Sequence, residues 1–156
     1  MHDQTDRLRE WLDSRRIPYR FLEHAPTHTS EESAAARGEP LEIGAKALLL
    51  KAGDEFVLAV LSAARKLDSK AMAKQLGVKK IRFATAEELF ARTGLVPGSV
   101  PPFGPPVLNV PLHIDRSVTR NERTAFNAGS LTSSIVMQTA DYLELANGVI
   151  ADFTMA

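Results

Sequence analysis

The chain has 156 residues, enough for one domain that buries a hydrophobic core without disulfides or structural metal. Lysine and arginine number 19, as do aspartate and glutamate, so no overall basic charge points to nucleic acid. The absence of cysteine excludes disulfides and thiol catalysis. Residues 1–16 lack the apolar core of a signal peptide, and no apolar run approaches the ~20 residues that span a bilayer, so we expect a soluble, cytoplasmic protein with no membrane contact.

In chain order, the sequence predicts helices and strands that alternate irregularly. The first helix carries an apolar stripe and ends before Pro18. Thr29 and Thr85 each precede a glutamate by three residues, which predicts a capping box, and Asp68 suits the N-cap of another helix. The predicted helices are 3–15, 27–37, 67–77, 85–94 and 139–148, and the predicted strands are 19–24, two runs within 44–62 that flank a turn at 52–54, 79–84, 107–115, 125–130 and 133–139.

This order of elements favours an α+β fold over a doubly wound parallel one. Two of the strand pairs, around 52–54 and between 125–130 and 133–139, are predicted hairpins. We expect a curved, mixed, largely antiparallel and barrel-like sheet flanked by helices. Because no repeat or low-complexity linker divides the chain, residues 1–156 are predicted to form a single domain.

Lys46 stands at the entry of a strand that is predicted to be buried on both faces. Side chains alternate along a strand, so Lys46 shares one face with Leu48 and Leu50, while alanines and a leucine line the other. An ammonium group in such surroundings needs an anion or the mouth of a pocket. The alternative is a lysine whose long side chain reaches solvent at the strand end.

A local basic segment covers residues 65–82, which hold seven of the nineteen basic residues and a single acid. Lys66, Lys70 and Lys74 recur every four residues, so we expect them along one side of a helix, where they suit phosphate groups. The alternative is a helix face that is merely solvated. Few aromatic residues lie among these cations, so base stacking is not suggested.

Residues 95–106, LVPGSVPPFGPP, form a loop with five prolines and two glycines. Proline fixes φ and removes a backbone donor, whereas glycine permits conformations that other residues avoid. Such a loop is stiff, Gly98 lets a ligand approach the main chain, and Ser99 adds a hydroxyl. The alternative is a rigid connector between a helix and a strand.

The histidines give weaker signals. His24 and His28 are four apart, but Pro26 between them breaks the helix that a metal pair at this spacing needs. A nucleophilic triad of Ser99, His113 and Asp115 can be written down, with the last two on one strand face. Nothing in the sequence places the serine beside them.

Seven segments occur together in an order that resembles the YbaK and prolyl-tRNA synthetase-associated editing-domain family, over roughly residues 17–150. They are EHAPTHTSEES, GAKALLL, LDSKAMAKQLGVKKIRFATAEEL, TGLVPGSVPPFG, LHIDRSV, AFNAGS and SSIVMQTADYLEL. The resemblance implies a freestanding deacylase that cleaves the ester between a wrong small amino acid and the acceptor end of tRNA(Pro). It implies no cofactor and no metal, and it suggests prolyl-tRNA synthetase as a docking partner.

The resemblance also implies roles for individual residues. Lys46 is expected to be catalytic, by holding the acceptor-end phosphate or ribose, while a ribose hydroxyl assists the attacking water. The expected substrate pocket consists of Gly98, Ser99, Pro101, Pro102, Gly104, Asp115, Asn127 and Gly129. The expected tRNA contacts are Thr29, Lys66, Lys70 and Lys74.

The amino acid removed is predicted to be alanine or cysteine, because rigid walls can exclude the larger proline ring. Asn127 stands where alanine-specific members of the family carry a histidine, which favours cysteine, whereas THTSEES and PGSVPPFG favour alanine. Serine, threonine and 2-aminobutyrate stay open. Two other classes also stay open: a non-catalytic tRNA-binding module, and a small-ester or amide hydrolase that uses the Ser99 triad.

Overall fold

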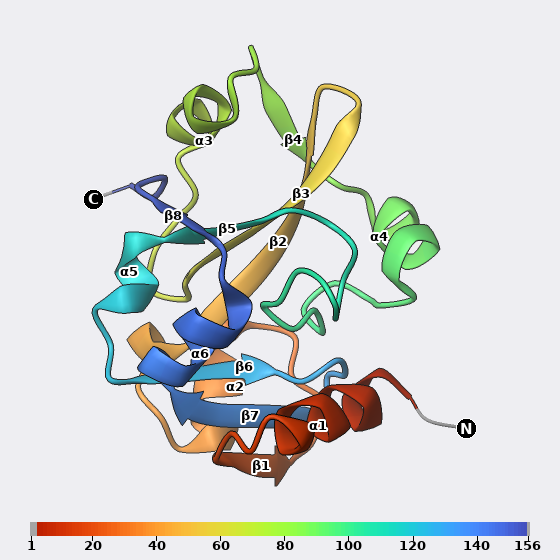
Figure 1. The fold of residues 1–156 in the computed structure, drawn as a ribbon, viewed down its shortest axis with the longest axis vertical. Helices are drawn as coiled ribbons and strands as arrows, with labels where there is room; N and C mark the ends of the chain where they lie inside the picture. Colours follow the sequence, from red (N-terminus) through yellow and green to blue (C-terminus); the bar gives the residue numbers. More distant parts are fainter. Residues whose placement is uncertain (1–2, 156) are drawn as a thin grey trace.

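The computed structural model describes residues 3–155, whose strands form two sheets with helices packed around them (Figure 1). The smaller sheet is antiparallel throughout, with strand β7 (Ser133–Gln138) between β1 (Tyr19–Glu23) and β6 (Arg123–Asn127). The larger sheet has the order β4 (Ile81–Phe83), β2 (Ala45–Ala52), β3 (Glu55–Ser62), β5 (Leu112–Asp115) and β8 (Val149–Ala151).

The α+β class and the largely antiparallel pairing are confirmed, but the single barrel-like sheet is not observed. Strands β4, β2 and β3 pair antiparallel, whereas β3, β5 and β8 pair in parallel. Within residues 3–155 the two sheets have separate linear orders, and an isolated bridge between Gly44 and Ala125 links them. Parallel pairing needs crossover connections between strands, which local sequence patterns do not reveal.

The helices begin and end close to where their capping residues predicted. Thr29 and Thr85 form complete capping boxes, and Asp68 accepts the N–H of Ala71. Glycines in the left-handed conformation end three of the helices. The observed helices are α1 (Gln4–Ser14), α2 (Ser30–Arg37), the 3₁₀ helix η1 (Leu41–Ile43), α3 (Ser69–Leu76), α4 (Ala86–Thr93), α5 (Arg116–Thr119) and α6 (Thr139–Ala146).

Three predicted boundaries are wrong. The strand predicted over 107–115 is limited to β5, because the chain before it is a loop that ends at Pro111. Strand β6 begins at Arg123 and ends at Asn127, so it precedes the predicted 125–130. The short elements α5 and β8 were not predicted, since neither is long enough to show a hydrophobic period.

The main core lies between the two sheets and is centred on Phe103. Its ring contacts those of Trp11, Phe126 and Tyr142 edge to face, with centroids 5.4, 5.6 and 5.2 Å away. A second, smaller core lies under α3, where Leu50 of β2 packs near Met72. The two faces of β2 therefore enter different cores, as the alternation of its side chains predicted.

The start of β2 extends beyond its neighbour β4. The ladder between these strands covers only Leu50–Ala52 of β2, although Ala84, just after β4, still donates its N–H to the Leu49 carbonyl. Figure 1 shows the β2–β3 hairpin projecting away from the three-stranded sheet, while the first residues of β2 run toward it. This open edge of β2 is where the candidate site lies.

Candidate active site

A cavity of about 200 Å³ lies at the start of β2. Four separate parts of the chain form its wall: the segment that enters α2, the start of β2, the loop after α4 and the end of β6. Its lining residues are Thr27, His28, Thr29, Ser30, Ser33, Arg37, Gly44, Ala45, Lys46, Ala47, Leu48, Ala63, Gly98, Val100 and Asn127. The structure thus brings together four of the predicted site residues, namely Thr29, Lys46, Gly98 and Asn127.

Lys46 reaches this cavity as a half-buried cation. Burial lowers the pKa of its ammonium group, and the nearby charge of Lys66 lowers that pKa further, while Glu31 acts in the opposite direction. Gly98 lines the same cavity. A cation and an exposed stretch of main chain therefore face one small space.

Arg37, near the end of α2, is a second cation in the wall and is not among the site residues predicted from the sequence. It is only 8% exposed. Its Nε donates to Ser134 Oγ at 2.9 Å, and its Nη2 donates to Asn127 Oδ1 at 3.0 Å. Burial lowers the pKa of its guanidinium group to about 10, although Glu39 acts in the opposite direction. A signal existed in the sequence, because Arg37 follows Ser33 and Ala34 by four and three residues and so shares their buried helix face.

Asn127 connects this arginine to the proline-rich loop. Its Oδ1 accepts hydrogen bonds from Arg37 and from Ser134 Oγ, the latter at 3.2 Å. Its Nδ2 donates to the Gly98 carbonyl at 2.6 Å. Gly98 itself has a φ of 87°, a conformation that glycine adopts without strain. A chain of hydrogen bonds thus runs from α2 through β6 to the loop and fixes three sides of the cavity relative to one another.

The segment that enters α2 adds polar groups to the wall. The Thr29 hydroxyl accepts the N–H of Glu32 at 3.1 Å, while Thr27 and Ser33 share a hydrogen bond of 2.8 Å. The first turn of a helix carries a partial positive charge. This charge lies on the same side as the two cations, so the cavity suits an anionic or strongly polar ligand.

The second half of the proline-rich loop belongs to the core. Ser99 is 1% exposed, and its hydroxyl bonds the backbone of Val96. The Pro102 carbonyl accepts the hydroxyl of Tyr142 at 2.6 Å. A side chain at Gly104 would lie 2.9 Å from the Val110 carbonyl oxygen. Of the predicted pocket residues, Ser99, Pro101, Pro102 and Gly104 are thus not among the residues that line the cavity, and their contacts anchor the loop.

Gly129 and Asp115 are also placed outside the cavity wall. The Gly129 N–H donates to the Ser99 carbonyl, and its Cα packs against Gln4. Asp115 is 2% exposed and accepts hydrogen bonds from the backbone of Phe153 and Ser117 and from the Thr154 hydroxyl. Although burial alone would raise the pKa of this carboxyl group, these hydrogen bonds hold it below its usual value. Both residues fasten one part of the chain to another.

The structure does not assemble the triad of Ser99, His113 and Asp115. The serine hydroxyl and the aspartate oxygens bond other groups, and the buried Nδ1 of His113 has no hydrogen-bond partner among residues 3–155. Burial lowers the pKa of the His113 imidazole. The three side chains therefore show none of the mutual hydrogen bonds that nucleophilic catalysis requires.

The basic segment is only partly a helix face. Lys70 and Lys74 are exposed on α3, as predicted, but Lys66 precedes the N-cap Asp68 and is not helical. The single stripe of three lysines is therefore wrong. Its charge still reaches the cavity, since Lys66 acts on the pKa of Lys46.

A second and larger cavity of about 740 Å³ lies between α1, α6 and the loop before β5. In the described part of the chain it shares no lining residue with the smaller cavity. Its charged and titratable lining residues are Arg15, His113, Asp141 and Glu144. The predicted catalytic lysine is not part of it.

The fold and the smaller cavity define a protein that receives a compact polar group bearing negative charge nearby. The chain belongs to the aminoacyl-tRNA editing domain family, whose model matches residues 24–145. It is 33% identical over 155 residues to the multifunctional Ser/Thr-tRNA deacylase ProXp-y of Escherichia coli strain K12, covering 94% of this chain and 90% of that protein. It is 29% identical to the prolyl-tRNA editing protein ProX of Acetoanaerobium sticklandii, covering 88% of each chain.

Among solved structures, the hypothetical protein APE2540 matches with a TM-score of 0.85 and 26% identity, over 95% of this chain and 99% of that one. The protein is an aminoacyl-tRNA deacylase, an enzyme that hydrolyses mischarged aminoacyl-tRNA. Among residues 3–155, no helix combines the length and apolar character that crossing a membrane requires.

Proposed function

We propose that this protein removes a small, wrongly attached amino acid from the 3′ end of tRNA(Pro), with the reaction in the cavity at the start of β2. The observation that carries the proposal is that Lys46 and Gly98 line one cavity of about 200 Å³. The choice of tRNA is supported by the ProX relative, which is named as a prolyl-tRNA editing protein. Prolyl-tRNA synthetase is the proposed docking partner, and the cytoplasm, where tRNA is charged, is the proposed location.

In this proposal Lys46 is the residue that touches the reacting end of the substrate. Its ammonium group holds the terminal phosphate or ribose, and a lysine with a lowered pKa is still a cation near neutral pH. The main chain at Gly98 and Val100 approaches the ester and stabilises the negative charge that develops on its carbonyl oxygen. Thr29 and the lysines at 66, 70 and 74 contact the tRNA around this end.

The reaction needs no protein nucleophile, because an aminoacyl ester is already activated. A water oxygen attacks the ester carbonyl carbon, and a ribose hydroxyl of the substrate assists by accepting its proton. The bond between the carbonyl carbon and the ribose oxygen then breaks, and that oxygen takes up a proton. The products are the free amino acid and a tRNA with an intact 3′ terminal ribose.

The cavity wall also bears on which amino acid is removed. Ala45, Ala47 and Gly98 leave space for a small side chain, whereas proline would meet a wall that hydrogen bonds hold in place. Thr27, Thr29, Ser30 and Ser33 add hydroxyl groups to the same wall. They favour serine or threonine, in line with the name of the ProXp-y relative, and alanine and cysteine are the second choice that size alone allows.

The test is a deacylation assay with seryl-, threonyl-, alanyl-, cysteinyl- and prolyl-tRNA(Pro), each corrected for spontaneous hydrolysis. The wild type is expected to release at least one small amino acid and to spare prolyl-tRNA. Lys46→Ala should lower kcat/KM at least about 100-fold, the size of effect seen when one electrostatic group is removed from an active site. Ser99→Ala should stay within about fivefold, because its hydroxyl serves the loop.

Two results would contradict the proposal. Binding of tRNA without release of any amino acid above the spontaneous rate would indicate a non-catalytic tRNA-binding module. Loss of activity in Ser99→Ala together with full activity in Lys46→Ala would indicate a serine hydrolase.

A further inference from the structure

An exposed aromatic ring stands beside the mouth of the small cavity. Phe83 is the last residue of β4 and is 57% exposed. It pairs with Leu50 of β2, at the point where the ladder ends and the open edge of β2 begins. A large apolar side chain this exposed is unusual on an edge strand, where a ring has few neighbours to pack against.

The register of the sheet places this ring on the same face as Lys46. Alternate residues of β2 share a face, so Lys46, Leu48 and Leu50 point the same way, and a residue paired with Leu50 points with them. Leu48 lines the cavity and is the diagonal neighbour of Phe83, at roughly 7–8 Å between backbones. The ring is therefore the next side chain along the open edge after the cavity wall.

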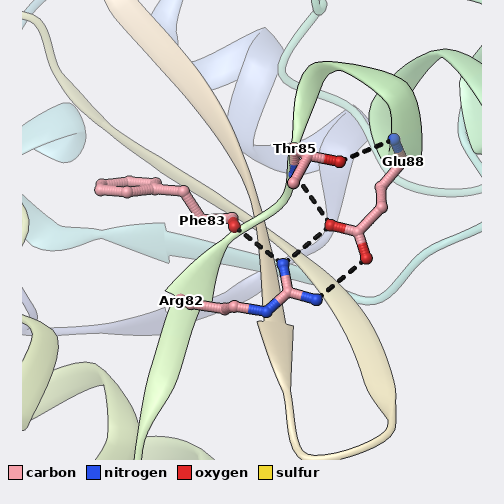
Figure 2. A network of polar contacts seen from close by, with 4 residues as sticks. All are labelled: Arg82, Phe83, Thr85 and Glu88. Atoms are coloured by element: carbon pink, nitrogen blue, oxygen red, sulfur yellow. Dashed lines mark hydrogen bonds and ion pairs between the residues drawn. The ribbon is translucent and has the colours of Figure 1, made fainter.

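The backbone of Phe83 is held by a polar network on the other side of the strand. Arg82 donates to both carboxylate oxygens of Glu88, at 2.8 and 3.0 Å, and to the Phe83 carbonyl at 3.1 Å. Glu88 also closes the capping box with Thr85. Figure 2 shows this network and the Phe83 ring extending away from it. The network leaves the ring fixed at its base and open on its face.

Positive charge accompanies the ring along the way into the cavity. Lys46 and Lys66 lie close enough for each to act on the other's ionisation, and Lys70 follows on α3, while Glu31 is the acid that acts on Lys46. Aromatic rings combined with lysines are the means by which proteins hold single-stranded nucleic acid, since every base has a face to stack and every nucleotide a phosphate. The cations among residues 65–82 lacked an aromatic partner in the sequence because Phe83 is one position further on.

We propose that Phe83 stacks on an unpaired base of the tRNA 3′ end, just before the terminal adenosine, and so guides the ester into the cavity. The inference rests on the proposed function, because it takes aminoacyl-tRNA as the substrate. Phe83 is a binding residue in this role and takes no part in the cleavage of the ester.

The experiment compares Phe83→Ala, Phe83→Trp and Phe90→Ala with the wild type. Phe90 is the matched control, because it is 61% exposed but lies on α4, outside the cavity wall. Each variant is assayed on the mischarged tRNA(Pro) that the wild type cleaves fastest, and on the same amino acid esterified to adenosine alone. Thermal unfolding is measured in parallel.

Phe83→Ala is expected to raise KM on aminoacyl-tRNA about 5- to 150-fold, the range that corresponds to the loss of one base stack, with kcat within about twofold. Phe83→Trp should keep KM near the wild-type value, and Phe90→Ala should not change it. On aminoacyl-adenosine, which has no preceding base, all variants should match the wild type.

Each other result separates this inference from the proposed function. If the wild type cleaves aminoacyl-tRNA but Phe83→Ala leaves KM unchanged, stacking at Phe83 is wrong and the proposed function stands. An equal loss on aminoacyl-adenosine would mean that the substitution disturbs the cavity itself, and stacking would again be rejected. A change confined to self-association in sedimentation would show that the ring meets a second protein copy instead. If the wild type cleaves no aminoacyl-tRNA at all, the proposed function fails first.

Discussion

The cavity at the start of β2 and the cavity between α1 and α6 differ in size, in charge and in what holds their walls. The first measures about 200 Å³ and carries Lys46 and Arg37 with no carboxylate among its described lining residues. The second measures about 740 Å³, and Asp141 and Glu144 line it together with Arg15. The 3′ end of a tRNA is a small polar group among phosphates, so the smaller, cationic cavity is the one that complements it.

The difference teaches that volume alone is a poor guide to a site. A wall fixed by hydrogen bonds can select a ligand by shape, as the link from Arg37 through Asn127 to Gly98 does for the small cavity. The large cavity has the opposite character, with an unpartnered His113 Nδ1 beside it in the described structure. Substitutions in the two regions should therefore have separable effects.

The largest effect is expected from Arg37→Met, which keeps the length of the side chain but removes its charge and donors. Asn127 would then lose a hydrogen bond that holds Gly98, so we expect kcat/KM for deacylation to fall about 10- to 100-fold. His113→Ala, in the other cavity, is the control and should stay within about twofold. Full activity in Arg37→Met, or an equal loss in His113→Ala, would erase the distinction between the cavities.

Asp115→Asn should lower stability and leave catalysis intact. An asparagine cannot accept all of the hydrogen bonds that the carboxylate receives, so we expect unfolding to be easier by about 2–3 kcal/mol. The measurement is urea unfolding at pH 7, together with kcat/KM at 25 °C. Because the native pKa of Asp115 is depressed, its contribution is present above the unfolded pKa and is lost as pH falls through the native value, so the two proteins should converge in acid below about pH 3.9. A variant as stable as the wild type but inactive would return Asp115 to the active site.

A graded effect is expected from pH. The ammonium form of Lys46 is the one that attracts an anion, and burial lowers its pKa from the usual 10.5, so activity should be present below the native pKa and decline as pH rises through it. The measurement is kcat/KM from pH 7 to 10, corrected for spontaneous ester hydrolysis. Lys46→Arg keeps its charge throughout this range and should show no such decline. Identical profiles for the two proteins would remove Lys46 as the cause.

The elements that the sequence predicts well are those with local signals. The capping boxes at Thr29 and Thr85 and the turn at 52–54 are confirmed, because a few neighbouring residues are enough to form them. The separation into two sheets depends on parallel pairing of β3 with β5, residues more than fifty positions apart. Short-range patterns carry no information about such a partner.

The same distinction applies to the site. Lys46 could be found because a charge in an apolar strand is conspicuous by itself. Arg37 could be placed on the buried face of its helix, but its partners Asn127 and Ser134 lie 90 and 97 residues away and become neighbours only in the fold. Ser99 and Asp115 misled for the converse reason, since their chemistry suits a pocket while their hydrogen bonds serve the loop and the chain end.

The division of the proline-rich loop has a consequence for how this enzyme can evolve. Its inner half is anchored around Phe103 in the core, and its outer half, Gly98 and Val100, borders the cavity. Mutations in the outer half can retune which amino acid is accepted while the anchor preserves the scaffold. A lineage can thus drift between preferences through few steps, and each intermediate still folds.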